Sequence, residues 1–176
     1  MFIFTNQIYW EMDILKAGTD WAKAEVFSSK IAFLLSLMFF LTAIGFWQLG
    51  KTAMAKAFVW PMLVAGILIV AVSAGLYFAN KPRITQFESA YNTDAKAFIE
   101  AETARTAKSQ NELALVFKIL PLIIIAAAVL IMFVNTPVWR AIGITAIVLM
   151  TVLMFIDSNT NARNTAYYQL LLLEKR

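Results

Sequence analysis

Four long apolar runs constrain the fold of this chain more than any other feature. They span residues 31–50, 57–79, 113–134 and 138–156, and their only charged residues are Lys118 and Arg140, each near the end of its run. A hydrocarbon layer about 30 Å thick needs roughly 20 apolar residues in a helix. The runs are too long for strands and lack the alternation of a membrane barrel. We therefore predict an all-α, polytopic membrane protein with four transmembrane helices.

Short links predict that these helices form two antiparallel hairpins, at 31–79 and 113–156. The first link covers about residues 50–56, and Gly50 is placed to end a helix in the left-handed conformation. The second link covers residues 135–137. Thr136 can cap the fourth helix, and Pro137 suits its first turn because the missing N–H would have no intrahelical partner.

Three flanking segments are predicted to be amphipathic helices outside the hydrocarbon layer. Residues 1–30 carry a stripe of Ile8, Met12 and Leu15 and a predicted break at 18–20. Residues 157–176 begin with a polar stretch, so we expect a C-terminal amphipathic helix that lies on the membrane or packs on the central segment.

The central segment, 80–112, follows a predicted stop or kink at 81–83. Its apolar residues recur at helical spacing between charged ones, which is typical of an amphipathic helix that is too polar to span. We predict one helix running on towards the third span, with an apolar stripe that needs a partner. The candidate partner-binding residues are Ile84, Phe87, Tyr91, Phe98 and Arg105.

Basic residues predict the orientation. The two termini and the central segment, counted with Lys118, hold 12 of the 15 Lys and Arg residues, and the links hold only Lys51, Lys56 and Arg140. The positive-inside rule then places both termini and the central segment in the cytoplasm. We expect a multi-pass protein of a bacterial-type inner membrane.

Composition argues against several functional classes. The chain has no Cys and no His, which removes thiol chemistry and nearly all zinc sites. No Asp or Glu lies in the apolar runs, where ion-coupled carriers usually need one. The polar residues in the runs can bond to their own helix backbone; they are Ser36, Thr42, Ser73, Thr145 and Thr151. We expect no enzyme activity, cofactor or metal, and no nucleic-acid binding because the basic residues are dispersed.

Residues 45–52, GFWQLGKT, match the phosphate-loop pattern G-x-x-x-x-G-K-[ST]. That loop functions after a strand, where a flexible turn directs backbone N–H groups at phosphates. Here the pattern ends a membrane helix and contains bulky side chains. We interpret it as an aromatic membrane edge followed by a helix stop, and nucleotide binding is the less favoured alternative.

Small residues recur on the second span at Ala71, Gly75 and Ala79. Such a stripe lets another helix approach closely. We favour packing within the chain, with residues 126–128 as the other half of the contact, over a homodimer contact.

These observations favour a non-enzymatic protein that docks or neutralises a membrane-associated protein partner. By architecture alone, the chain is similar to small polytopic immunity proteins, which protect a bacterium from membrane-targeting toxins. The alternative is an accessory subunit or oligomeric channel component of a larger transport or secretion complex, which would self-associate through residues 71, 75 and 79. Membrane lipid is an expected partner in either case.

Overall fold

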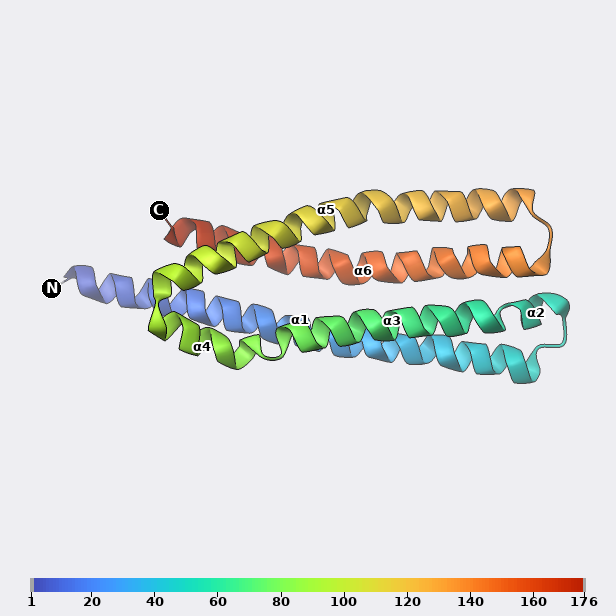
Figure 1. Ribbon diagram of the computed structural model, residues 1–176, viewed down its shortest axis with the longest axis horizontal. Coiled ribbons are helices and arrows are strands. Elements are labelled where there is room, and N and C mark those ends of the chain that lie inside the picture. The colour runs from blue at the N-terminus through green and yellow to red at the C-terminus, as the bar shows by residue number, and fades with distance from the viewer. Residues whose placement is uncertain (1, 176) are drawn as a thin grey trace.

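The computed structural model describes the backbone of residues 2–175 and the side chains of residues 14–175. Its regular elements, within those residues, are all helices (Figure 1); they are α1 (Phe2–Leu49), α2 (Ala53–Ala57), α3 (Val59–Asn80), α4 (Arg83–Thr93), α5 (Ala95–Phe133) and α6 (Pro137–Glu174). Four helical stretches are long and apolar enough to cross a membrane. The predictions of an all-α chain and of four such helices are confirmed.

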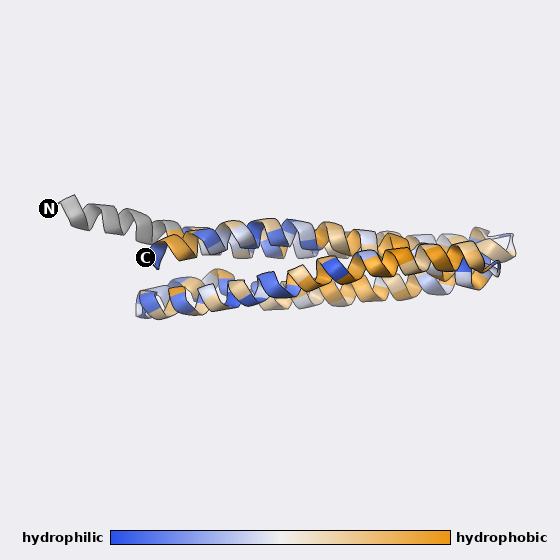
Figure 2. Ribbon diagram, turned by 90° about the horizontal axis from the view of Figure 1, so that it is seen from above, coloured by the Kyte–Doolittle hydropathy of each residue, from blue (hydrophilic) through white to orange (hydrophobic). Residues whose placement is uncertain are grey.

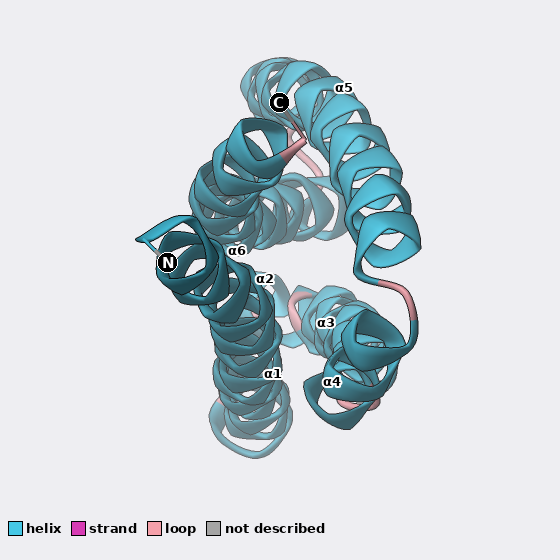
Figure 3. Ribbon diagram, turned by 90° about the vertical axis from the view of Figure 1, so that its left-hand side faces the viewer, coloured by secondary structure: helices cyan, strands magenta, loops and turns pink. Residues whose placement is uncertain are grey.

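The long helices run side by side in two pairs. α1 packs mainly against α3 and α4, and α5 packs mainly against α6. The pairs meet where α6 contacts α1, α2 and α3, as the end view shows (Figure 3). α3 and α4 together return along α1, because the chain turns at residues 81–82 and then continues in nearly the same direction (Figure 1).

The helices are longer than a membrane requires. α5 has 39 residues, which at 1.5 Å per residue is about 58 Å, against about 30 Å of hydrocarbon. Hydrophobic residues gather towards the end with the two links, and hydrophilic ones towards the end with the termini (Figure 2). We call residues 31–79 and 113–156 the apolar half, and residues 14–30, 80–112 and 157–175 the polar half.

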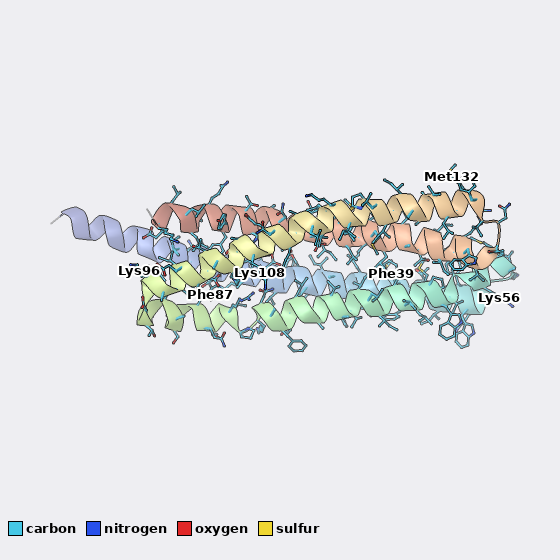
Figure 4. All side chains as sticks on the ribbon, turned by 45° about the horizontal axis from the view of Figure 1, so that its top comes forward. Phe39, Lys56, Phe87, Lys96, Lys108 and Met132 are labelled. Carbon is cyan, nitrogen blue, oxygen red and sulfur yellow. The ribbon has the colours of Figure 1, made fainter. Side chains whose placement is uncertain are left out.

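The apolar half buries little and exposes much. Its core contains Ala32, Phe39, Ala65, Ile69 and Leu149, whereas large side chains point outward (Figure 4). The most exposed include Leu49, Trp60, Phe78, Met132 and Phe133, each with at least 73% of its surface exposed. Soluble proteins rarely expose contiguous apolar surface on this scale, and a membrane-spanning bundle requires it.

Most polar side chains of the apolar half bond to their own helix, as predicted. The hydroxyls of Ser36, Thr42, Ser73 and Thr151 each donate to a backbone carbonyl three or four residues earlier, at 2.6–2.8 Å. Thr145 is the exception: its hydroxyl has no hydrogen-bond partner among the described residues.

The links differ in detail from the prediction. α1 ends before Gly50, but no glycine has a positive φ, so the predicted left-handed end is wrong. The last bond of the helical series is the one that the Gly50 N–H donates to the Phe46 carbonyl, at 3.0 Å. Pro137 begins α6, as predicted, and Thr136 is the N-cap residue, although its side chain makes no capping bond.

The predicted helix break at residues 18–20 is absent, because α1 continues through them. The predicted C-terminal helix is a continuation of the fourth apolar helix, because α6 runs unbroken through the polar residues 157–160. Gly18 is explained by packing: a Cβ there would lie 2.7 Å from the Tyr167 Oη and 3.2 Å from the Phe87 ring. From the sequence alone, a glycine that makes room for a packed ring cannot be told apart from a glycine that forms a turn. The predicted Ile8 and Met12 stripe lies outside the described side chains.

The central segment has a break that the sequence reasoning missed. The predicted single helix over 84–112 is wrong, because the chain reverses at Asp94 between α4 and α5. Asp94 caps α5, its Oδ1 accepting the Ala97 N–H at 2.9 Å. α4 and α5 fold against each other, so their apolar residues still form one cluster.

Candidate functional site

The predicted partner-binding stripe lies mostly inside the molecule. Phe87 of α4 and Phe98 of α5 are each 6% exposed, and their rings meet edge to face with centroids 5.2 Å apart. Tyr91 also meets Phe98 edge to face, at 5.6 Å, and Ile84 packs beside them half-buried. Figure 4 places Phe87 in the polar half. The structure therefore brings the stripe together and covers it with the chain's own helices.

Arg105, the fifth residue of that stripe, belongs to a charged cluster around Trp21. Its guanidinium lies 4.2 Å from the Trp21 ring centroid. It also donates to both carboxylate oxygens of Glu102, with Nε to Oε1 at 2.9 Å and Nη2 to Oε2 at 2.7 Å. A two-pronged ion pair stacked on an aromatic face holds the planar guanidinium in one orientation. Burial and the nearby Arg105 lower the pKa of Arg83, which lies 5.8 Å from the same ring.

Tyr167 of α6 closes the other side of this cluster. Its ring stacks on Trp21 with centroids 5.9 Å apart, and only 3% of the residue is exposed. Tyr167 lies eleven residues beyond the apolar run that ends at 156, and therefore outside the stretch suited to hydrocarbon. Burial raises the pKa of its phenol, and the Glu102 carboxylate raises it further.

A second buried ion pair joins the two helix pairs. Glu25 of α1 is 1% exposed, and it accepts from the Nε and Nη2 of Arg163 at 2.9 and 2.8 Å. The Thr160 hydroxyl donates to its other oxygen at 3.1 Å. A buried carboxylate is tolerated only when it is paired and hydrogen-bonded in this way. The pair therefore ties α1 to α6 at one fixed register.

One further bond ties α5 to α6. The Asn164 side chain is fully buried, and it donates to the Thr106 carbonyl at 3.2 Å. The two buried carboxylates of the polar half, Glu25 and Glu102, are thus each paired with an arginine. No group of metal-binding side chains was found among the described residues. This arrangement can fix three helices, α1, α5 and α6, relative to one another, and we name it the polar lock: Trp21, Glu25, Glu102, Arg105, Arg163 and Tyr167.

Sequence reasoning missed most of the polar lock. It searched the apolar runs for buried acids, and Glu25 and Glu102 lie outside those runs. Glu25 shares one face of α1 with Ala22, Val26 and Ser29, all buried in the structure. A carboxylate within an apolar face was the one available signal.

The small-residue stripe is exposed. Ala71, Gly75 and Ala79 all face outward, and a Cβ added at Gly75 would have no atom of the described chain within 4 Å. The predicted packing within the chain is wrong, because α3 and α5 make no contact over the described residues. Of residues 126–128, Ala127 is buried against α6 instead: Gly143 is so close that a Cβ there would lie 3.2 Å from the Ala127 carbonyl.

Residues 45–52 do not have phosphate-loop geometry. The first five residues are the last part of α1, with helix where a strand would have to precede the loop. The Thr52 hydroxyl accepts the Ala55 N–H at 3.1 Å and caps α2. The structure agrees with the interpretation of a helix stop.

Comparisons of the chain with protein-family models, with curated proteins and with solved structures found no match.

Proposed function

We propose that this chain is a non-enzymatic protein of a bacterial-type inner membrane that docks a membrane-embedded helix of a protein partner. In this proposal, the apolar half crosses the membrane four times as two antiparallel hairpins. The polar half and both termini lie in the cytoplasm, where 12 of the 15 basic residues would then be found.

The observation that carries the proposal is the exposed small-residue face of α3. In lipid, helices associate through close packing because the hydrocarbon is as apolar as the side chains. Small residues at Ala71, Gly75 and Ala79 allow that close approach, and no helix of the described chain occupies the face. A face shaped for a helix and left open favours a partner outside the chain.

A shallow groove beside this face also favours it as the site where a partner helix docks. It measures about 410 Å³, lies between α1 and α3, and is lined by Phe33, Leu34, Val70, Ala74 and Tyr77 among others. Side chains of a docked helix need such depressions to interdigitate. The groove and the small residues together form the docking surface that we propose.

The polar lock supports a docking role indirectly. It fixes α1 against α6, so the membrane helices leave the polar half at fixed positions. A preorganised surface loses less conformational entropy when a partner binds. The stripe around Phe87 and Phe98 suits a partner less well, because a partner could reach these rings only by displacing the chain's own helices.

The partner class follows from the predicted architecture. We favour a membrane-targeting toxin or a subunit of a membrane complex, as for a small immunity protein. The second candidate is self-association into an oligomeric channel component, which the same α3 face would also serve.

A matched glycine pair tests the proposal. Gly75→Ile places a branched side chain on the docking surface, whereas Gly45→Ile adds the same bulk where a Cβ also has no neighbour within 4 Å. Gly75→Ile should abolish recovery of the partner in pull-downs from native membranes, and Gly45→Ile should not. Equal recovery with both variants would contradict the proposal.

Cross-linking separates the two candidates. The chain has no Cys, so Gly75→Cys introduces a single thiol into the docking surface. A covalent homodimer formed in native membranes supports self-association. A cross-link to a different protein supports the docking of a foreign partner.

A further inference from the structure

A second groove lies in the apolar half, nearer the links than the docking surface is. It measures about 630 Å³ and runs between α3 and α6 near the end with the links; its lining includes Lys56, Trp60, Val64, Ile142, Thr145 and Ala146. Figure 4 shows Lys56 at that end of the molecule. A helix about 10 Å wide would fill this volume with roughly five residues. The groove therefore suits a thinner occupant, such as an acyl chain.

The link end carries positive charge without a counter-charge. Lys51, Lys56 and Arg140 are all exposed there. The sequence has no Asp or Glu between Glu25 and Glu88, or between Glu112 and Asp157. The anions that neutralise these cations must therefore come from outside the apolar half, and in a membrane the nearest anions are lipid phosphates.

A buried hydroxyl in the groove points to the same ligand. Thr145 is only 3% exposed, and its Oγ1 has no hydrogen-bond partner among the described residues. The hydroxyls of Ser36, Ser73 and Thr151, by contrast, bond to their own helix backbone. A buried hydroxyl without a partner is unfavourable, so a ligand with a carbonyl acceptor would be stabilised at this position.

We propose that this groove binds one anionic phospholipid. Its phosphate pairs with Lys56, and one acyl chain lies between α3 and α6. Thr145 lies eight residues into α6, about 12 Å from its start, and donates to an ester carbonyl below the phosphate. Trp60 and Trp139, at the same end, are the kind of residue that anchors a helix at the lipid headgroups.

The experiment compares two lipids with the same acyl chains. Palmitoyl-oleoyl phosphatidylglycerol and palmitoyl-oleoyl phosphatidylcholine are added to the detergent-solubilised full chain, and bound lipid is counted by native mass spectrometry. We expect phosphatidylglycerol to bind at least about fivefold more tightly, since each nearby cation contributes about that factor. Lys56→Gln should remove about fivefold of the preference. Lys118→Gln removes an exposed cation that does not line the groove and should change the preference less than twofold.

Two further variants test the groove and the hydroxyl. Ala146→Trp should fill the groove and abolish tight binding of both lipids, and Thr145→Val should weaken phosphatidylglycerol binding severalfold. Val129→Trp, on an exposed position of α5 outside the groove, should leave binding unchanged, and circular dichroism melting confirms that each variant folds. Equal binding of the two lipids, or phosphatidylglycerol retained by folded Ala146→Trp, would overturn the proposal.

Discussion

The buried Glu25–Arg163 pair yields the sharpest prediction about stability. Removing one partner of a buried ion pair costs about 3–5 kcal/mol, because the other charge remains buried and unpaired. Arg163→Leu leaves the Glu25 carboxylate at 1% exposure, so we expect a loss of about 3 kcal/mol. Glu25→Leu leaves a guanidinium that is 27% exposed and can regain water, so we expect about 2 kcal/mol.

The double variant separates the pair from the single residues. Replacing both partners by leucine leaves no buried charge, and such replacements are often neutral. We expect Glu25→Leu with Arg163→Leu to cost about 2 kcal/mol or less, which is a coupling free energy of about 3 kcal/mol. The assay is unfolding in mixed micelles of a mild detergent and sodium dodecyl sulfate, followed by far-ultraviolet circular dichroism.

An exposed ion pair provides the control. Asp20 and Lys23 lie 3.8 Å apart with 59% of each side chain exposed. Asp20→Ala should therefore change the free energy of unfolding by less than about 0.5 kcal/mol. If the two leucine effects simply add, or if neither exceeds the Asp20→Ala effect, the polar lock does not hold α1 against α6.

Three further outcomes follow from the polar half. Gly18→Ala should destabilise the protein by about 1–2 kcal/mol through overpacking, whereas Gly45→Ala should be neutral or stabilising because its Cβ meets nothing; both are read by the same unfolding assay. Asp94→Ala should cost about 1 kcal/mol through loss of the α5 cap, and Thr136→Ala, where no side-chain cap exists, should cost clearly less. The raised pKa of Tyr167 means that the unfolded chain loses the phenolic proton first, near its ordinary pKa of about 10. Stability should therefore fall as pH rises above about 10, by a steeper slope than in Tyr167→Phe; equal slopes would contradict the buried position of the phenol.

Segments with a single strong signal were predictable from the sequence. Apolar runs of about 20 residues with at most one charge predicted four helices able to cross a membrane, because a helix satisfies its own backbone hydrogen bonds in hydrocarbon. Lys81 and Pro82 were correctly predicted to interrupt the helix, since proline removes a backbone donor.

Segments with competing local and tertiary signals were not predictable. Gly18 reads as a break, but it is a packing position whose partner, Tyr167, lies about 150 residues away in the sequence. Asp94 reads as one polar residue among many in an amphipathic pattern, and the pattern survives its reversal because α4 and α5 pack face to face.

The small-residue stripe of α3 was recognised in the sequence, but its packing partner was not. Ala71, Gly75 and Ala79 predict that a helix packs closely, but not which helix. The partner inside the chain depends on how the helix pairs meet, and α3 meets α1 and α6 through other residues. Spacing alone therefore identified the surface and misassigned its partner.

Membrane topology is the most direct test of the account. Single cysteines replace Thr52 and Thr136 in the two links, Asn92 near the α4–α5 turn and Glu174 at the end of α6, in a chain that has none. The account predicts that a membrane-impermeant maleimide labels positions 52 and 136 in intact spheroplasts, and positions 92 and 174 only after lysis. Labelling of positions 52 and 92 from the same side would contradict the four-span arrangement with its polar half in the cytoplasm.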